Sequence, residues 1–166
     1  MNVNTHKRMV WTVAALCIFI AAVLTSAQEA VAAGIVINEV ELNPPGFDTD
    51  TEWIELLNTG DTTVDLAGWS VSYSYRVRGR MVISETSLPL SPGARYVFVY
   101  PGLRLRNAEG MPIELLDAQG TVIDETASMT DPFDNTYTWQ RWPDGGDPAW
   151  PGFWLFGEAT PNAPNE

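Results

Sequence analysis

Short runs of β-forming residues, each closed by glycine, proline, asparagine or aspartate, follow one another along the chain after residue 33. The run Trp69–Val77 alternates apolar or aromatic side chains with serine and arginine, which is the period of a strand with one buried face. No stretch of this part keeps the 3.6-residue period of an amphipathic helix. Many short strands with regularly spaced turns predict an all-β sandwich or barrel.

The turn residues set the expected boundaries. A turn at Arg78-Gly79 is expected to join Trp69–Val77 to a partner strand at Met81–Ser84, and Ala118-Gln119-Gly120 is expected to close a tight hairpin. The other expected strands are Ile35–Leu42, Glu52–Asn58, Arg95–Tyr100, Pro112–Asp117, Thr121–Glu125 and Tyr137–Trp142.

The N-terminus has the pattern of an export signal. Lys7 and Arg8 precede an apolar run of 16 residues, Met9–Leu24, and small residues follow at Ala30–Ala33. Because about 20 residues are needed to span a bilayer as a helix, the run predicts a cleaved signal peptide over residues 1–33. An uncleaved membrane anchor over residues 9–24 is the alternative. In both cases the remaining chain is expected to be secreted or held at the cell surface.

The chain's only histidine, cysteine and lysine lie within this segment. His6, Cys17 and Lys7 are the single histidine, cysteine and lysine of the chain. The part after residue 33 therefore has no Ser–His–Asp triad, no Cys–His pair, no His or Cys zinc site, no P-loop lysine and no disulfide.

The chain is strongly acidic, with a formal net charge of −12. Loss of Lys7, Arg8 and Glu29 with the segment leaves 7 basic and 20 acidic residues, or about −13. A surface of this charge repels phosphate backbones, so no nucleic-acid partner is expected.

The segment Ile35–Val71 carries a family resemblance. Its Asn38-Glu39-Val40, Glu52-Trp53-Ile54-Glu55-Leu56, Asn58, Gly60, Asp65-Leu66 and Gly68-Trp69 resemble the opening of lamin tail domains. Further along, Arg141 before Pro143-Asp144-Gly145 and the late Thr160-Pro161-Asn162 also resemble that family, with Asn162 where glycine is usual.

This resemblance implies an immunoglobulin-like antiparallel β-sandwich over residues 34–160, followed by a flexible tail at 161–166. It also implies a non-catalytic interaction module that binds an envelope or extracellular protein, or a surface polysaccharide. The membrane is expected to be contacted only through the N-terminal segment, if that segment stays uncleaved.

An acidic turn is the candidate metal site. Asp48, Asp50 and Glu52 alternate just before a strand, and carboxylate oxygens are the ligands that Ca²⁺ prefers. The alternative is a solvated acidic turn that leads into the strand. No other cofactor is expected.

Arg76, Arg78 and Arg80 fall within five positions and alternate, so they are expected on one face of a hairpin. They fit an anionic glycan or the acidic surface of a neighbouring copy. Alternatively, they protect an exposed strand edge from pairing.

Aromatic residues crowd the C-terminal part. Trp150 and Trp154 are the candidate contacts of a carbohydrate-binding module, which is the second functional hypothesis. The alternative is that these rings close the core of a domain without disulfides.

The third hypothesis is a carboxylate-dependent hydrolase that uses Glu39 and Glu55, which the resemblance places on adjacent strands. A pair of carboxylates can perform acid–base catalysis. The alternative is a sheet face in which these residues pair with Arg95 or Arg141.

Export is directly testable. After cell fractionation, the protein is expected outside the cytoplasm, either shortened by about 33 residues or held in the membrane at full length. Full-length protein in the cytoplasm would contradict the localisation.

Overall fold

A computed structural model describes residues 34–48, 50–75, 77–99, 105, 107–108, 110, 112–146 and 153–165. All regular structure within these residues is β-strand, and they contain no helix long and apolar enough to cross a membrane. The segment expected to act as the export signal lies outside them. The strands are β1 Ile35–Glu41, β2 Trp53–Asn58, β3 Val64–Asp65, β4 Ser70–Tyr75, β5 Val77–Val82, β6 Pro89–Leu90, β7 Arg95–Val99, β8 Ile113–Leu116, β9 Val122–Glu125, β10 Tyr137–Trp142 and β11 Phe153–Glu158.

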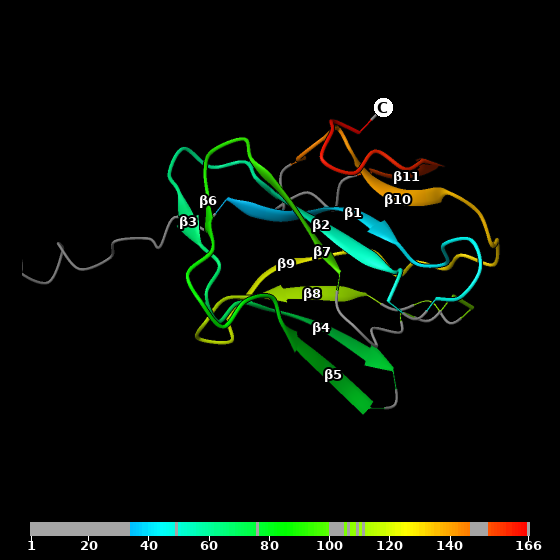
Figure 1. Cartoon of the computed structure of the whole chain (residues 1–166), viewed down its shortest axis with the longest axis horizontal. Coiled ribbons are helices and arrows are strands. Elements are labelled where there is room, and N and C mark those ends of the chain that lie inside the picture. The colour runs from blue at the N-terminus through cyan, green and yellow to red at the C-terminus, as the bar shows by residue number, and fades with distance from the viewer. Residues whose placement is uncertain are drawn as a thin grey trace, which may run out of the picture. The chain divides into compact units, whose positions relative to one another are not determined.

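The strands form two facing layers (Figure 1). One sheet has the order β11-β10-β1-β2-β7, and the other has the order β5-β4-β8-β9. Every strand pairing in both sheets is antiparallel, and β3 pairs with β6 in a small third sheet. The predicted all-β antiparallel fold is confirmed, and it agrees with an immunoglobulin-like sandwich.

The hydrophobic core lies between the two layers. The first sheet buries Ile35, Ile37 and Ile54, and the second sheet buries Val71 and Leu115. Each such side chain contributes roughly 1.5–3 kcal/mol through removal from water. This is the stabilisation expected of a domain that has no disulfide to rely on.

β1 contains a bulge at Asn38. The pairing of β1 with β2 skips between Ile37 and Glu39, so the backbone groups of Ile37 need other partners. Ile37 N donates to Asp124 Oδ2 at 2.7 Å, and Arg141 Nε donates to Ile37 O at 2.7 Å. Arg141 also forms an ion pair with Asp124, and both side chains are buried. These two residues therefore join β10 and β1 of one sheet to β9 of the other.

The expected hairpin turn is wrong. Gly79 lies inside β5, opposite Tyr73, and Tyr75 pairs with Val77, so Arg78-Gly79 is part of the strand pairing and not a turn. A Cβ atom at position 79 would lie 2.5 Å from Tyr73 Cζ. The glycine is needed because the tyrosine ring covers it, and not because the chain turns there.

Three strands were not anticipated from the sequence. β3 and β6 have two residues each, which is too short for a recognisable alternation. β11 has the continuous sequence FWLFGE, in which no apolar–polar period marks a strand.

The buried ion pair gives a stability prediction. Arg141→Ala leaves Asp124 buried without its counter-charge and Ile37 O without its donor, so it is expected to cost about 3–5 kcal/mol of unfolding free energy. Gln119→Ala, at an exposed side chain between β8 and β9, is the control and should change the value by less than about 0.5 kcal/mol. Denaturant unfolding measures both, and equal effects would contradict the assigned role.

Candidate functional site

Glu39 and Glu55 stand directly opposite each other on β1 and β2, and both are fully buried. Glu55 Oε1 accepts a hydrogen bond from Asn38 Nδ2 at 3.0 Å and lies 3.4 Å from Arg95 Nε. Burial raises the pKa of Glu55, and the hydrogen bonds and the arginine partly offset this rise. Glu39 Oε1 accepts from Thr138 Oγ1 of β10. The predicted adjacency of the two carboxyl groups is therefore present.

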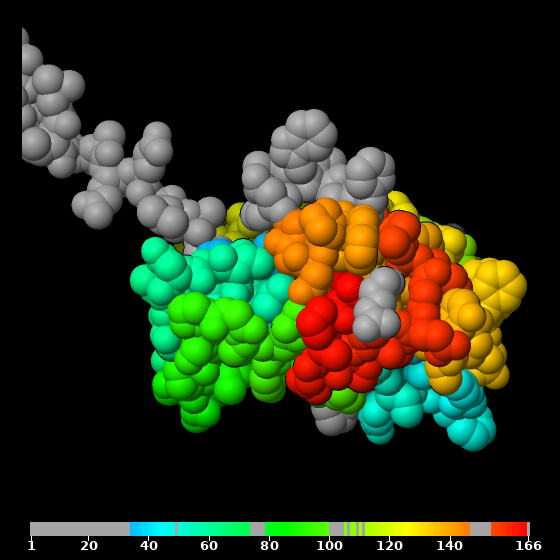
Figure 2. Space-filling model, turned by 90° about the horizontal axis from the view of Figure 1, so that it is seen from above, coloured from blue at the N-terminus to red at the C-terminus, as the bar shows by residue number. Residues whose placement is uncertain are grey.

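The end of the chain closes over these carboxylates. Thr160 N donates to Glu39 Oε1 at 2.8 Å, and Asn162 N donates to Glu55 Oε2 at 2.6 Å. Asn165 is buried, and its Nδ2 donates to Asn38 O and Arg141 O, both at 3.0 Å. Figure 2 looks onto this face, where the red C-terminal residues lie beside the orange β10.

The structure thus differs from the expectation of a flexible tail at 161–166. Residues up to 165 are held because the buried carboxylates of β1 and β2 accept their backbone N–H groups. Asn162 has φ 63°, a left-handed conformation that asparagine tolerates.

A hydrolytic role finds no support in this arrangement. Both carboxyl groups are buried under the chain end, and the bonds they accept are structural. Arg95, one of the two suggested partners, pairs with Glu55, and it also forms an ion pair with Asp144. Arg141 pairs instead with Asp124, on the opposite face of the sheet.

The three acidic residues of the calcium hypothesis are not brought together. Asp50 is exposed, whereas Glu52 is buried and its Oε2 accepts from Leu105 N at 2.7 Å. Asp48 Oδ2 accepts from Asn107 Nδ2 at 3.2 Å. Within the described residues, no group of three or more acidic side chains is arranged to hold a metal ion. Glu52 serves to hold the loop at Leu105.

Two of the three alternating arginines, Arg78 and Arg80, lie on a described strand. Both lie in β5, two positions apart. The exposed Arg80 donates from Nε to Ser70 Oγ of β4 at 2.8 Å. Arg76 lies outside the described residues, and so does Trp150.

Trp154 is less available than a sugar-stacking residue would be. It lies in β11, is half-buried, and packs against the core. The Arg141 guanidinium carbon lies 5.0 Å from the centre of its ring, so the cation occupies one face of the indole.

Other aromatic rings gather around Phe156 of β11. Its ring centre lies 5.3 Å from that of Trp139, 5.7 Å from that of Tyr137 and 6.5 Å from that of Phe133. The ring planes are tilted by 41–59° to one another. They do not form the flat platform on which sugar rings stack, but they do form a continuous apolar surface.

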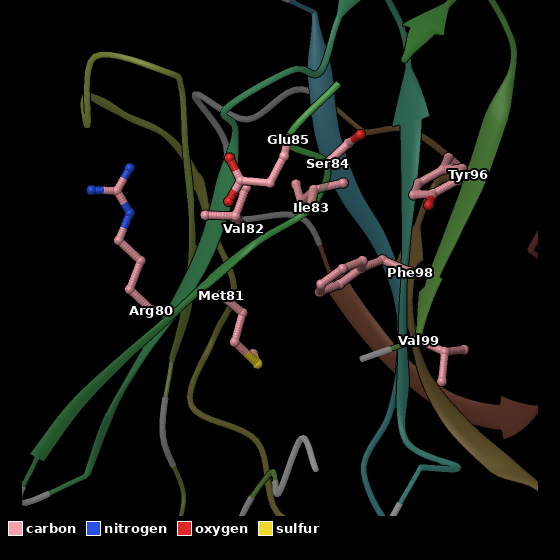
Figure 3. Close-up of a pocket in the computed structure, with 9 residues that line it drawn as sticks. All are labelled: Arg80, Met81, Val82, Ile83, Ser84, Glu85, Tyr96, Phe98 and Val99. Carbon is pink, nitrogen blue, oxygen red and sulfur yellow. The ribbon is translucent and has the colours of Figure 1, made fainter. Parts of the chain in front are cut away.

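A groove opens between the free edges of the two sheets. β5 is the last strand of one sheet and β7 the last strand of the other, and a cavity of about 440 Å³ lies between them. Figure 3 shows Phe98 of β7 pointing toward Ile83 and Met81, whereas Arg80 points away. Tyr96 of β7 also lines the cavity, together with the polar residues Ser84 and Glu85.

The sequence interpretation missed this groove. Its lining comes from residues 80–85 and from β7, which are distant in the sequence. The apolar members Met81 and Ile83 follow the same alternation as ordinary core residues, so the sequence does not reveal an opening.

A family model for the lamin tail domain matches residues 28–130, which is more than half of the chain. The protein therefore belongs to the lamin tail domain family, as the sequence resemblance predicts. Lamin tail domains are non-enzymatic immunoglobulin-like folds, which indicates an interaction module. No curated protein matches the chain. The match ends before β10 and β11, although both strands belong to the five-stranded sheet.

The residues that carry the resemblance hold loops in place. Asn58 Nδ2 donates to Thr62 O and Leu90 O, both at 2.8 Å. Asp65 accepts from Leu88 N at 2.7 Å and from Ser87 Oγ, and these bonds lower its pKa. Asn58 and Asp65, two residues of the family pattern, therefore have a structural role in this sandwich.

Glu41, at the end of β1, is 3% exposed and has a perturbed pKa. Burial raises the pKa to about 7, the neighbouring Asp131 and Glu39 carboxyl groups add to the rise, and a hydrogen bond from Asn43 N opposes it. Burial also raises the pKa of Asp131.

This shift predicts a pH-dependent stability. The folded state holds a proton on Glu41 more tightly than the unfolded state, so the stabilisation is present below about pH 4.5 and is lost as pH rises to about 7. The loss is roughly 1–3 kcal/mol, at 1.36 kcal/mol per pKa unit with allowance for relaxation. Glu41→Gln should reduce the difference in unfolding free energy between pH 5 and pH 8 by this amount.

Asp61→Asn, at an exposed carboxyl group, is the control, and it should keep the wild-type pH profile. If Glu41→Gln also kept that profile, Glu41 would not be the titrating group.

Proposed function

We propose that this lamin tail domain is a non-catalytic binding module that works outside the cytoplasm, where it binds an extended segment of an envelope or extracellular protein. The observation that carries the proposal is the groove between β5 and β7. The N-terminal sequence pattern supports the location.

The groove has the features by which sheet edges bind peptides. Both β5 and β7 are end strands of their sheets, so each has main-chain N–H and C=O groups with no strand beside them in the described part of the chain. An extended segment can pair with such an edge and place alternate side chains in the groove beside it. Met81, Ile83 and Phe98 supply apolar contacts there, and Arg80, Ser84 and Glu85 supply polar ones.

The electrostatics favour a protein partner over a nucleic acid. The chain has a net charge of −12, and the groove is lined by one exposed cation, Arg80, and one exposed carboxylate, Glu85. Such a mixed rim fits a polypeptide that carries both signs of charge, whereas a phosphate backbone needs clustered cations.

Site-directed photo-crosslinking tests this function. With the photoreactive residue benzoylphenylalanine in place of Met81, irradiation of intact producing cells is expected to give defined adducts with an envelope or secreted protein. The same residue in place of the exposed Val122, on β9, is the control and should give several-fold less of those adducts.

Two outcomes would contradict the proposal. Equal adducts from both positions would mean that the groove is not the binding site. Retention of the purified protein by surface polysaccharide, unaffected by Met81→Arg, would favour the carbohydrate-binding hypothesis instead.

A further inference from the structure

β11 is the other end strand of the five-stranded sheet, and it is an unusual one. No strand pairs with its far side within the described residues. Natural edge strands are commonly protected by lysine, proline or a bulge. β11 has the sequence FWLFGE, an unbroken register with β10, and a single charge at its last residue, Glu158. Among the described residues, nothing in its sequence or pairing blocks this edge from pairing with another strand.

The hydrogen bonding of β10 fixes which groups face that edge. Ala159 N donates to Thr136 O at 3.0 Å, one step beyond the Tyr137–Glu158 pair. Because bonded and non-bonded pairs alternate in an antiparallel ladder, Gly157 and Leu155 make the bonds to β10. The backbone N–H and C=O groups of Trp154 and Phe156 then point toward the free edge.

Apolar side chains flank this edge on both faces of the sheet. Leu155 is 44% exposed. The neighbouring residues Trp154 and Phe156 project from the opposite face, and Phe156 adjoins Tyr137 and Phe133, which are 38% and 58% exposed. An edge with free backbone groups and apolar margins has the composition of a protein interface.

We propose that β11 pairs antiparallel with β11 of a second copy of this chain, about a twofold axis at Leu155. The outward N–H and C=O groups of Trp154 and Phe156 are placed symmetrically about Leu155. The donors of each copy therefore face the acceptors of the other. Trp154 then lies opposite Phe156 of the other copy, and Leu155 lies opposite the same residue. Two bonded pairs supply roughly four backbone hydrogen bonds.

Charge favours this arrangement over a parallel one. Antiparallel pairing places the two Glu158 carboxylates at opposite ends of the joined strands, whereas parallel pairing would place them side by side. The inference does not depend on the groove between β5 and β7, which lies at the other edge of the sheet.

The expected dimer is weak. A strand of six residues is about 20 Å long, so the contact falls at the low end of interface sizes, below about 1,200 Å², and micromolar dissociation is expected. Each copy carries a net charge of −12, so added salt should strengthen the dimer because it screens the repulsion.

Disulfide trapping tests the register. In the full-length Cys17→Ser chain, Leu155→Cys is the single thiol, and the two copies of residue 155 face each other in a non-bonded pair. The Cα atoms of such a pair are about 4.5 Å apart, within disulfide range. A covalent dimer is expected under mild oxidation. Val99→Cys, 47% exposed on the other edge strand β7, should stay monomeric.

Sedimentation velocity gives an independent readout. The wild-type chain at about 100 µM is expected to contain dimer, and Leu155→Lys should raise the dissociation constant at least about tenfold because two like charges then face each other. Val99→Lys should behave as the wild type, and equal melting temperatures establish that both variants fold.

The proposal is overturned if the wild type is monomeric under these conditions. It is equally overturned if Leu155→Lys dimerises as the wild type does, or if both cysteine variants crosslink to the same extent.

Discussion

The backbone of β1 cannot follow an ideal ladder at Asn38, and the rest of the sandwich is arranged around that irregularity. Unpaired polar groups in a dry interior are costly, so the backbone groups of Ile37 must find side-chain partners in place of the backbone ladder. Asp124 and Arg141 supply them on the core side of the sheet. Asn38 itself is covered on the outer side by Asn165. A single extra residue in one strand therefore connects both sheets and the end of the chain.

Many polar residues near this bulge are buried, and they specify the fold more than they stabilise it. A buried ion pair gains little over well-packed apolar side chains, because desolvation offsets the attraction. The burial that raises the pKa of Asp124 despite the adjacent guanidinium is a direct sign of this cost. What the pair provides is geometry: in the observed register of β1 and β10, Asp124 and Arg141 satisfy each other and the backbone of Ile37 together.

Local patterns in the sequence predict the strands well, and long-range contacts are what they miss. The alternation in Trp69–Val77 and the paired segments around Ala118-Gln119-Gly120 are properties of neighbouring residues, and they match β4, β8 and β9. Gly79 misled the interpretation because a glycine opposite a tyrosine ring looks, in sequence, like a glycine in a turn. The buried end of the chain was invisible because Thr160 and Asn162 bind carboxylates more than 100 positions away. The sequence also did not show that one face of the Trp154 ring is covered, because the arginine that covers it, Arg141, lies on another strand.

The position of the last residues has a consequence for the order in which this fold can be completed. The first described strand, β1, lies between β2 and β10, so one side of it has no neighbour until β10 has been made. The carboxylates of Glu39 and Glu55 lack the donors from Thr160 and Asn162 until those residues arrive. A chain that emerges N-terminus first can collapse early, but it cannot reach this native state before residues 160–162 are free to pack. Completion of the fold thus reports that the chain has been delivered at least as far as these residues.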